Sequence, residues 1–234
     1  MAKKVFLGIG HGGADSGACA NGLREKDLNL VIGTECAAVL RRHGVEVLMS
    51  RTGDVNETLD DKIRRCNAFK PDLAADIHNN AGGGDGAECF HHYKGGMGKT
   101  LSENILKALV AIGQNSRGAK TKRNALGKDW YAFIRNTNDP AIIVECAFLD
   151  HKEDVKLVDT LAEQKAVGLA IAKGFLTTLG ITYVEEKPVV QAPVQNTGNT
   201  DKIYRVQVGA YKVKANAEAM QKKLKDAGFS AIIV

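Results

Sequence analysis

Five short apolar runs alternate along the first 180 residues with four longer segments of helical periodicity. The apolar runs cover Lys4–Ile9, Val45–Met49, Leu73–Ile77, Ala87–Tyr93 and Ala141–Phe148. The helical segments cover Glu25–His43, Thr58–Phe69, Gly98–Ile112 and Leu161–Leu179. Strands that alternate with helices of this length are typical of an α/β domain. We therefore predict a mostly parallel, twisted sheet flanked by helices, with Gly44 ending the first helix.

The apolar pattern stops after residue 181, which predicts a domain boundary. Residues 182–202 contain two of the four prolines among Gln, Asn, Thr and Gly, a composition typical of a linker. Residues 203–208 then alternate like a strand, a helix is expected from about Ala215, and Phe229–Val234 reads as a second strand. The expected organisation is a catalytic domain over 1–181, a linker over 182–202 and a short β-α-β fragment over 203–234, too small to bury a core alone.

Composition excludes several classes of protein. The chain has 234 residues, of which 44% are hydrophobic and 25% charged, as in ordinary globular proteins. No apolar run reaches the roughly 18 residues of a membrane span, and the start of the chain does not resemble a signal peptide. The five cysteines are scattered without a C-x-x-C pair, which argues against disulfides or a cysteine zinc site. We expect synthesis in the cytoplasm and neither a nucleic-acid nor a membrane partner.

The net charge of +5 lies mainly in the tail. From Asp201 onward there are seven Lys and Arg against three Asp and Glu, which leaves 25 against 24 in the first 200 residues. A basic tail fits an anionic cell envelope or a solvated surface.

Three apolar strands end in residues that do not suit a core: His11, His78 and Glu145. Ligands of open α/β sheets bind beyond the carboxyl ends of the strands, so we expect these side chains to converge. Glu25 begins the first predicted helix, where the helix dipole alone would favour a carboxylate. As a third ligand beside two histidines, it would complete the donor set of a catalytic zinc site with an open position. Glu145 would then remain free as the general base.

Other readings of nearby residues are weaker. Gly8–Gly13 formally matches the dinucleotide fingerprint G-x-G-x-x-G, but small and polar residues continue for about ten positions before the helix begins. His91 or His92 could line the cleft, whereas His43 suits a helix end. We expect Trp130 to serve packing rather than recognition, and Arg51 to be structural or to border the substrate.

The sequence resembles the zinc-dependent N-acetylmuramoyl-L-alanine amidases of the third type. The matching segments occur in the family's order and span about residues 3–180: Gly10–Ala18, Gly22–Leu30, Ser50–Asp54, Ile77–Ala81 and Pro140–Leu149. The resemblance implies a Zn²⁺ ion held by His11, Glu25 and His78, with Glu145 catalytic and Asn80 at a substrate-binding position. This family cleaves the amide between N-acetylmuramic acid and the L-alanine of the peptidoglycan stem peptide.

The sequence departs from the family pattern at four positions near the motifs. Asp76 stands in place of a Ser, Lys62 in place of an Arg, Ala147 in place of a Gly and His151 in place of an Asn. None is an expected ligand, so we expect the departures to affect substrate detail rather than the reaction.

The tail, Tyr204–Phe229, resembles the first half of a sporulation-related repeat (SPOR) domain. Such domains bind glycan strands that have lost their stem peptides. Because the second half is absent, we predict that two copies complete each other's sheet, giving a homodimer through residues 203–234.

These features favour a peptidoglycan hydrolase, with two alternatives. A zinc carboxypeptidase or endopeptidase acting on the stem peptide would use the same ligands, and a non-catalytic wall-binding protein would not need Glu145. Without a signal peptide, release through a phage holin or by mother-cell lysis would bring the enzyme to the wall. The sequence does not choose between a phage endolysin and a bacterial autolysin of sporulation.

Overall fold

A computed structural model of the chain describes residues 2–185, 214–226 and 229–233. Its contacts divide the chain into two units, residues 1–186 and 187–234. The strands are β1 (Lys4–Ile9), β2 (Cys19–Ala20), β3 (Leu23–Arg24), β4 (Glu46–Met49), β5 (Leu73–Asn80), β6 (Ala87–His91), β7 (Ser116–Lys120) and β8 (Ala141–Phe148). The helices are α1 (Glu25–Arg42), α2 (Leu59–Phe69), α3 (Met97–Val110), α4 (Ala132–Asn136), α5 (Lys152–Val155), α6 (Leu161–Leu179) and α7 (Lys214–Asp226).

Six strands form the central sheet in the order β4-β1-β5-β8-β6-β7. The first four run parallel, β6 is antiparallel to β8, and β7 is parallel to β6. The predicted α/β fold with a mostly parallel sheet is confirmed. The strands β1, β5 and β8, which carry the expected site residues, are neighbours in the middle of this sheet.

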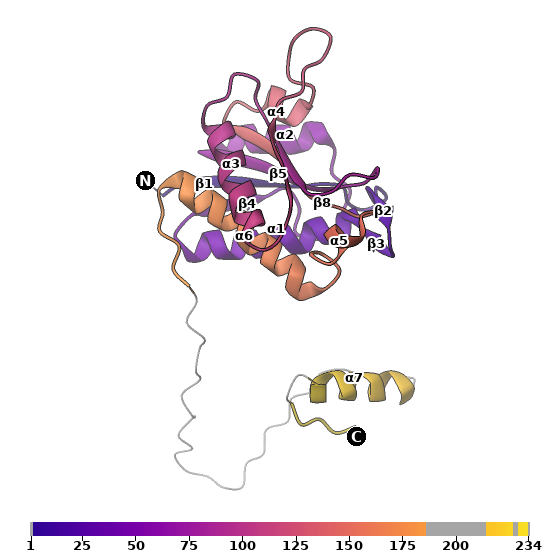
Figure 1. Cartoon of the computed structure of the whole chain (residues 1–234). Coiled ribbons are helices and arrows are strands. Elements are labelled where there is room, and N and C mark those ends of the chain that lie inside the picture. Colours follow the sequence, from indigo (N-terminus) through magenta and orange to yellow (C-terminus); the bar gives the residue numbers. More distant parts are fainter. Residues whose placement is uncertain (1, 186–213, 227–228, 234) are drawn as a thin grey trace, which may run out of the picture. The chain divides into compact units, whose positions relative to one another are not determined.

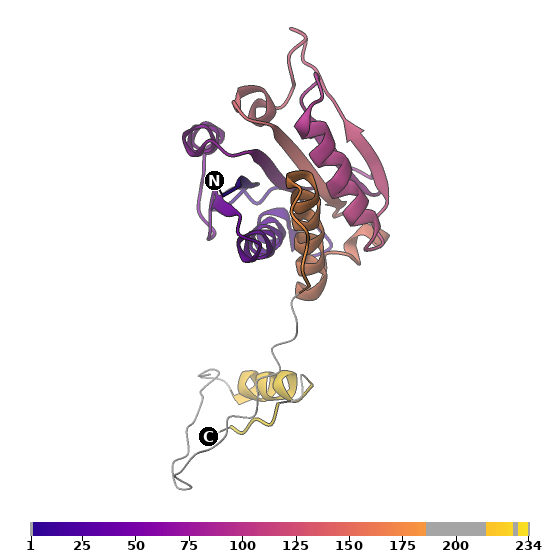
Figure 2. The same ribbon diagram turned by 90° about the vertical axis from the view of Figure 1, so that its left-hand side faces the viewer.

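Helices cover both faces of the sheet (Figures 1 and 2). Leu7 and Ile9 of β1 belong to the larger core, which contains the buried residues of α1, α3 and α6. Phe6 points to the opposite face and packs in a smaller core that includes Ile63 of α2 and Phe133 of α4. Because side chains alternate along a strand, even-numbered residues of β1 therefore face α2 and α4.

Local signals fix the ends of the helices around this sheet. The Thr58 hydroxyl caps α2 by accepting from the Asp61 amide, and Thr160 and Glu163 form a capping box at the start of α6. Gly44 follows α1 with a φ of 76°, and its amide donates to the Arg41 carbonyl, as the sequence predicts.

Several elements differ from the sequence prediction. β5 continues to Asn80, three residues beyond the predicted end, so His78 lies within the strand rather than after it. The edge strand β7, the two-residue strands β2 and β3 and the short helices α4 and α5 were not predicted. The sequence of β7, Ser-Arg-Gly-Ala-Lys, lacks the apolar alternation of a half-buried strand because the strand lies at the sheet edge.

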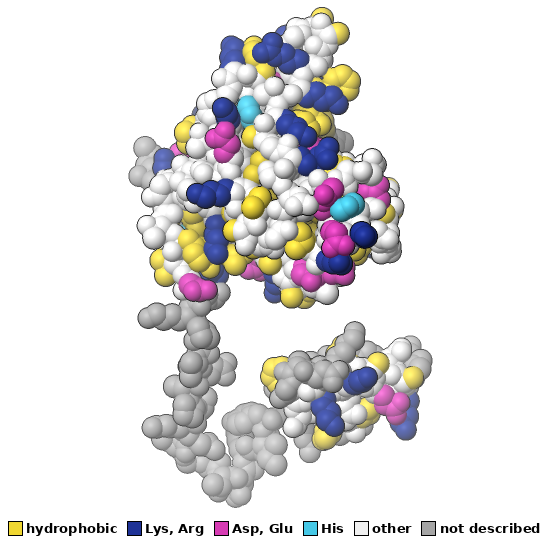
Figure 3. Space-filling view, viewed as in Figure 1, with side chains coloured by type: hydrophobic (Ala, Val, Ile, Leu, Met, Phe, Trp, Pro, Cys, Tyr) yellow, Lys and Arg dark blue, Asp and Glu magenta, His cyan; other side chains and the backbone are white. Residues whose placement is uncertain are grey.

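The surface of the 1–186 unit carries both signs of charge on the face seen in Figure 3, in keeping with its near-neutral composition. Within the described residues, no helix combines the length and the apolarity that crossing a bilayer requires.

In the C-terminal unit, the predicted helix is confirmed as α7. The predicted strand over 203–208 lies outside the described residues. The strand predicted at the end of the chain is wrong for residues 229–233, which form no strand and instead contact α7. The Phe229 amide donates to the Leu224 carbonyl, and Gln221 donates to the Ala231 carbonyl. The described residues thus give no support to the predicted homodimer, because its sheet required this strand.

Candidate active site

The pairing of β1, β5 and β8 places the expected site residues on one face of the sheet. His78 is the backbone partner of Glu145, and one row below it Asp76 is the partner of both Gly8 and Ile143. Partners on adjacent strands point to the same face, which here is the face covered by α2 and α4. The imidazole of His78 and the carboxylate of Glu145 therefore emerge side by side at the carboxyl ends of the strands.

The three expected ligands converge. His11 Nε2 lies 3.1 Å from Glu25 Oε2, and His78 Nδ1 lies 2.9 Å from Glu25 Oε1. One donor atom from each of the three residues lies within 4.8 Å of the others. His11 has a φ of 60°, a rare conformation for a residue with a side chain, in the turn that follows β1.

Glu25, the first residue of α1, is held in place by main-chain amides of the preceding loop and of β5. Its carboxylate accepts from the amides of Ala18 and Asn79, at 2.8 and 3.0 Å. Burial raises the pKa of Glu25, but the hydrogen bonds from His11, His78 and the Ala18 amide, together with the charge of His78, outweigh this effect, so the pKa is lowered and the group stays ionised. A buried, ionised carboxylate between two imidazoles is a donor set that can hold a transition-metal cation such as Zn²⁺.

Each of the two histidines also contacts a further carboxylate through its other nitrogen. His11 Nδ1 lies 2.8 Å from Asp15 Oδ2, and His78 Nε2 lies 3.4 Å from Asp76 Oδ2. Such outer carboxylates fix the tautomer and orientation of metal-binding histidines. Neither aspartate was predicted as part of the site from the sequence.

Glycines of the first loop leave the space that the site needs. A Cβ atom at Gly10 would lie 2.4 Å from Cε1 of His78, and one at Gly17 would lie 2.5 Å from Glu25 Oε2. Gly17 also has a φ of 63°, which favours glycine. Gly10, which is part of the Gly8–Gly13 match to the dinucleotide fingerprint, thus has a different role, since it leaves room for the His78 ring.

Glu145 differs from Glu25 because one of its carboxylate oxygens accepts no hydrogen bond in the part of the chain that the structure describes. Its side chain is partly buried beside the ligand cluster, and the buried Oε2 atom has no hydrogen-bond partner among the described residues. Burial raises the pKa of Glu145 to about 7; His78 opposes the shift, while the charges of Glu25 and Glu88 add to it. A carboxyl group with this pKa suits proton transfer at neutral pH.

Two of the departures from the family pattern contact each other. Lys62 Nζ of α2 lies 2.8 and 3.0 Å from the two carboxylate oxygens of Asp76. Burial raises the pKa of Asp76, but the charges and hydrogen bonds of Lys62 and His78 together outweigh this effect and lower the pKa. The pair is therefore ionised within the interior, directly below His78.

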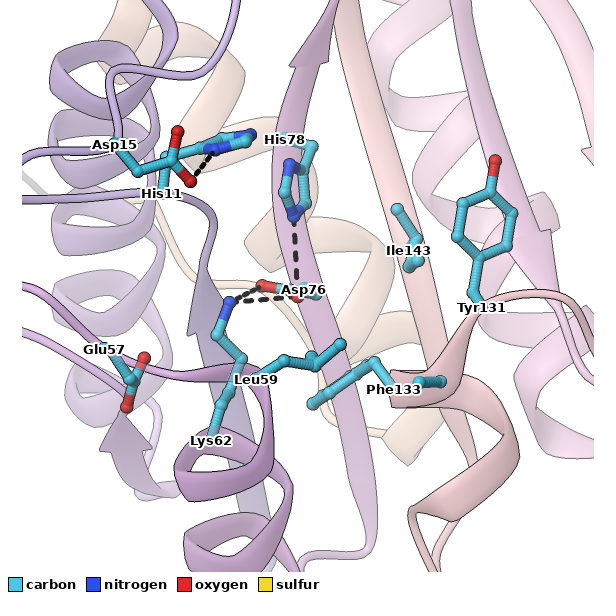
Figure 4. Close-up of a pocket in the computed structure, with 11 residues that line it drawn as sticks. His11, Asp15, Glu57, Leu59, Lys62, Asp76, His78, Tyr131, Phe133 and Ile143 are labelled. Atoms are coloured by element: carbon cyan, nitrogen blue, oxygen red, sulfur yellow. Dashed lines mark hydrogen bonds and ion pairs between the residues drawn. The ribbon is translucent and has the colours of Figure 1, made fainter.

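A cavity of about 300 Å³ opens beside these residues. Figure 4 shows His11, His78 and Asp76 on one side of it and Tyr131 and Phe133, from the region of α4, on the other. The cavity offers a mixed polar and apolar wall next to the ligand cluster. It matches the expected position of a ligand at the carboxyl ends of parallel strands.

Other residues singled out in the sequence lie outside the ligand cluster. Asn80, at the end of β5, donates to Glu88 at 3.3 Å and accepts from the Ala81 amide, and its substrate role stays a prediction. His91 Nδ1 contacts the His92 carbonyl, and His92 pairs with Asp129, so neither belongs to the cluster.

Trp130 and Arg51 complete the comparison with the sequence. Trp130, which we expect to serve packing rather than recognition, is 53% exposed, and the Lys122 ammonium lies over its ring. Arg51 is structural, since its buried guanidinium donates to the carbonyls of Gly10 and Lys26.

Comparison with known proteins identifies the domain that carries this site. Residues 5–177 match the model of the N-acetylmuramoyl-L-alanine amidase family (Amidase_3). The chain belongs to this family. Residues 176–234 of this amidase match the model of the SPOR domain, which binds peptidoglycan.

Individual relatives agree with the family assignment. The amidase is 30% identical over 235 residues to the sporulation-specific N-acetylmuramoyl-L-alanine amidase of Bacillus subtilis (strain 168), covering 99% of this chain and 84% of that protein. It is 36% identical over 185 residues to the endolysin of Bacillus phage SPP1, covering 73% and 66%. Among solved structures, Cwp6 from Clostridium difficile has a TM-score of 0.75 at 37% identity. That match covers 76% of this amidase but spans only 30% of Cwp6.

Proposed function

We propose that this amidase hydrolyses the bond between N-acetylmuramic acid and L-alanine with a zinc ion held by His11, Glu25 and His78, and with Glu145 as general base. The observation that carries the proposal is that two different environments lie side by side, one at His78 of β5 and one at Glu145 of β8. One is a closed cluster of three donor groups, and the other is a buried carboxyl oxygen without a partner.

The donor chemistry fits zinc. Two imidazoles and one carboxylate are the ligands of many catalytic zinc sites and leave a fourth position open. Magnesium and calcium prefer sites made of oxygen ligands, which two histidines do not provide. The clearances at Gly10 and Gly17 also support a site built around these three side chains. When bound, zinc supplies a Lewis acid that polarises a carbonyl group and makes water acidic near neutral pH.

Glu145 carries the proton in this scheme. Oε2 accepts a proton from the water that attacks the lactyl carbonyl carbon, and a carbon–oxygen bond forms. The same carboxyl group then gives the proton to the nitrogen of L-alanine as the carbon–nitrogen bond breaks. The products are a free lactyl carboxylate on the glycan and a stem peptide with a free amino terminus.

Analysis of these products separates the proposal from its closest alternative. Purified peptidoglycan digested with the amidase should gain new amino-terminal L-alanine, measured by dinitrophenylation, and glycan strands without peptides, seen by mass spectrometry. A zinc carboxypeptidase or endopeptidase would instead release D-amino acids or cut between stem-peptide residues. New peptide carboxylates without new L-alanine termini would contradict the proposal.

The part of the chain that matches the SPOR domain supports a second role, in which residues 176–234 hold the enzyme on peptidoglycan. The glycan strands that the amidase strips of peptides would then be its preferred anchor. Holin-mediated release and mother-cell lysis both remain hypotheses for how it reaches the wall, since the relatives include an endolysin and a sporulation-specific amidase.

A further inference from the structure

Lys62 and Asp76 form an ion pair that is almost fully removed from water. Only 7% of the Lys62 side chain and 4% of the Asp76 side chain are exposed. A buried ion pair is a poor source of stability, because the loss of hydration offsets most of the attraction between the charges. Apolar residues of similar size would serve a core at least as well, so this position calls for another explanation.

The contacts of Asp76 explain why charged residues occupy this position. Its Oδ1 and Oδ2 atoms both contact Lys62, and Oδ2 also lies 3.4 Å from Nε2 of His78. The opposite ring nitrogen of His78, Nδ1, faces Glu25 in the ligand cluster. Figure 4 shows this chain of contacts, in which Asp76 lies between the ammonium group and the imidazole ring.

The sheet is shaped to admit this carboxylate. Gly8 is the backbone partner of Asp76 on β1, and a Cβ atom at Gly8 would lie 2.4 Å from Asp76 Oδ1. Gly10, two residues along the same strand direction, leaves room for the His78 ring in the same way. The two glycines clear adjacent spaces, one for the imidazole and one for the carboxylate below it.

We infer that Asp76, held by Lys62, positions His78 for the metal. Asp76 accepts a hydrogen bond from the protonated Nε2, so the lone pair of Nδ1 is directed into the cluster with His11 and Glu25. Lys62 fixes the carboxylate and compensates its charge. Asp76 is a positioning residue here, because it acts through His78 and is not one of the three expected ligands. The inference rests on the proposed zinc site, and it adds a requirement that the three ligands alone do not make.

Two double variants test the inference in the full chain. K62M/D76L and K62M/D76N both remove the two buried charges together, and Leu and Asn have nearly the same size and shape. Only Asn retains an oxygen that accepts from Nε2. The zinc dissociation constant is measured by competition with a chromogenic chelator, and the thermal unfolding midpoint of each variant records its stability.

We expect K62M/D76L to bind zinc about 10- to 100-fold more weakly than the parent, the range typical of lost outer contacts to metal ligands. K62M/D76N should recover most of this affinity. Equal dissociation constants for the two variants would overturn the inference, whatever their relative stability. A parent that binds no zinc would instead contradict the proposed zinc site itself.

A measurement on the unaltered protein covers the case in which a variant does not fold. In a long-range proton–nitrogen spectrum of the zinc-loaded parent, the ring proton of His78 is expected on Nε2. A proton on Nδ1 would overturn the inference, because that nitrogen could then not serve the cluster.

Discussion

His78 and Glu145 are backbone partners on the parallel strands β5 and β8, so an imidazole of the ligand cluster and an uncommitted carboxyl group stand at the same level of one sheet face. The two strands are separated by 60 residues of sequence, and their pairing brings the groups together. The two glutamates of the site, Glu25 and Glu145, lie in different environments, as the proposed mechanism requires. Glu25 is kept ionised between the histidines, whereas burial raises the pKa of Glu145 to about 7.

Replacing Glu145 with Gln should abolish proton transfer and leave the ligand cluster intact. The amide is nearly isosteric but cannot accept the proton of the attacking water, so the rate of L-alanine release should fall by roughly 10² to 10⁴-fold. Zinc content should equal that of the parent. A release rate within threefold of the parent would refute the assigned role.

The same substitution should change how stability depends on pH. The folded state raises the pKa of Glu145 from 4.5 to about 7, so it binds this proton more tightly than the unfolded state. The parent therefore loses stability as pH rises from about 4.5 to 7, and Glu145→Gln does not incur this loss. In metal-free protein, the variant should gain up to ~3 kcal/mol over the parent by pH 8, a gain absent near pH 4.

Urea unfolding of both proteins at pH 4, 6 and 8 measures this difference. A gain that is the same at all three values would mean that Glu145 does not titrate in the folded protein as described.

Gly10→Ala should damage the site without touching a ligand. The new methyl group would lie 2.4 Å from the His78 ring, and β1 is buried too tightly to move away. We expect zinc affinity to fall at least 10-fold. Gly53→Ala is the matched control, since a Cβ atom at Gly53 meets nothing within 4 Å. If the two substitutions affect zinc binding equally, the clearance at Gly10 has no role.

Truncation after Glu185 should separate catalysis from wall binding. Tyr183 stacks on His43, and the Val184 amide donates to the same ring, so a cut at residue 182 would remove contacts of the amidase domain. The shortened protein should cleave a soluble muropeptide at the parent's rate. Its sedimentation with peptidoglycan stripped of stem peptides should fall several-fold, and unchanged sedimentation would contradict a binding role for the tail.

The sequence predicts the layers of this fold well because its central strands are locally distinctive. β1 and β8 are mostly apolar runs whose observed bounds match the predicted ones, and α6 matches its predicted range to the residue. β7 escapes prediction because an edge strand needs little apolar surface. The strand expected at 229–233 does not form, which shows that an apolar segment without a sheet to join is weak evidence for a strand.

Some residues of the candidate site could likewise be predicted from the sequence, and others could not. His11, Glu25, His78 and Glu145 were predicted from their places at strand and helix ends, and the structure brings them together. The Lys62–Asp76 pair was not predicted, because each charge alone suggests an exposed residue and their contact depends on how α2 packs over β5. The spacing of Lys62 and Asp76 along the sequence does not indicate that the two residues are in contact. The interruption of an apolar strand by Asp76 was the one feature that could have indicated it.

The measurement that tests the account most directly is zinc content and activity followed together. The amidase is purified without added metal, analysed by plasma mass spectrometry, stripped with a chelator and titrated with zinc while L-alanine termini are counted. We predict one zinc per chain, loss of release on stripping and recovery at one equivalent, with His11→Ala and His78→Ala each failing to retain the metal. Full release by the stripped protein, or stoichiometric zinc in both histidine variants, would contradict the account.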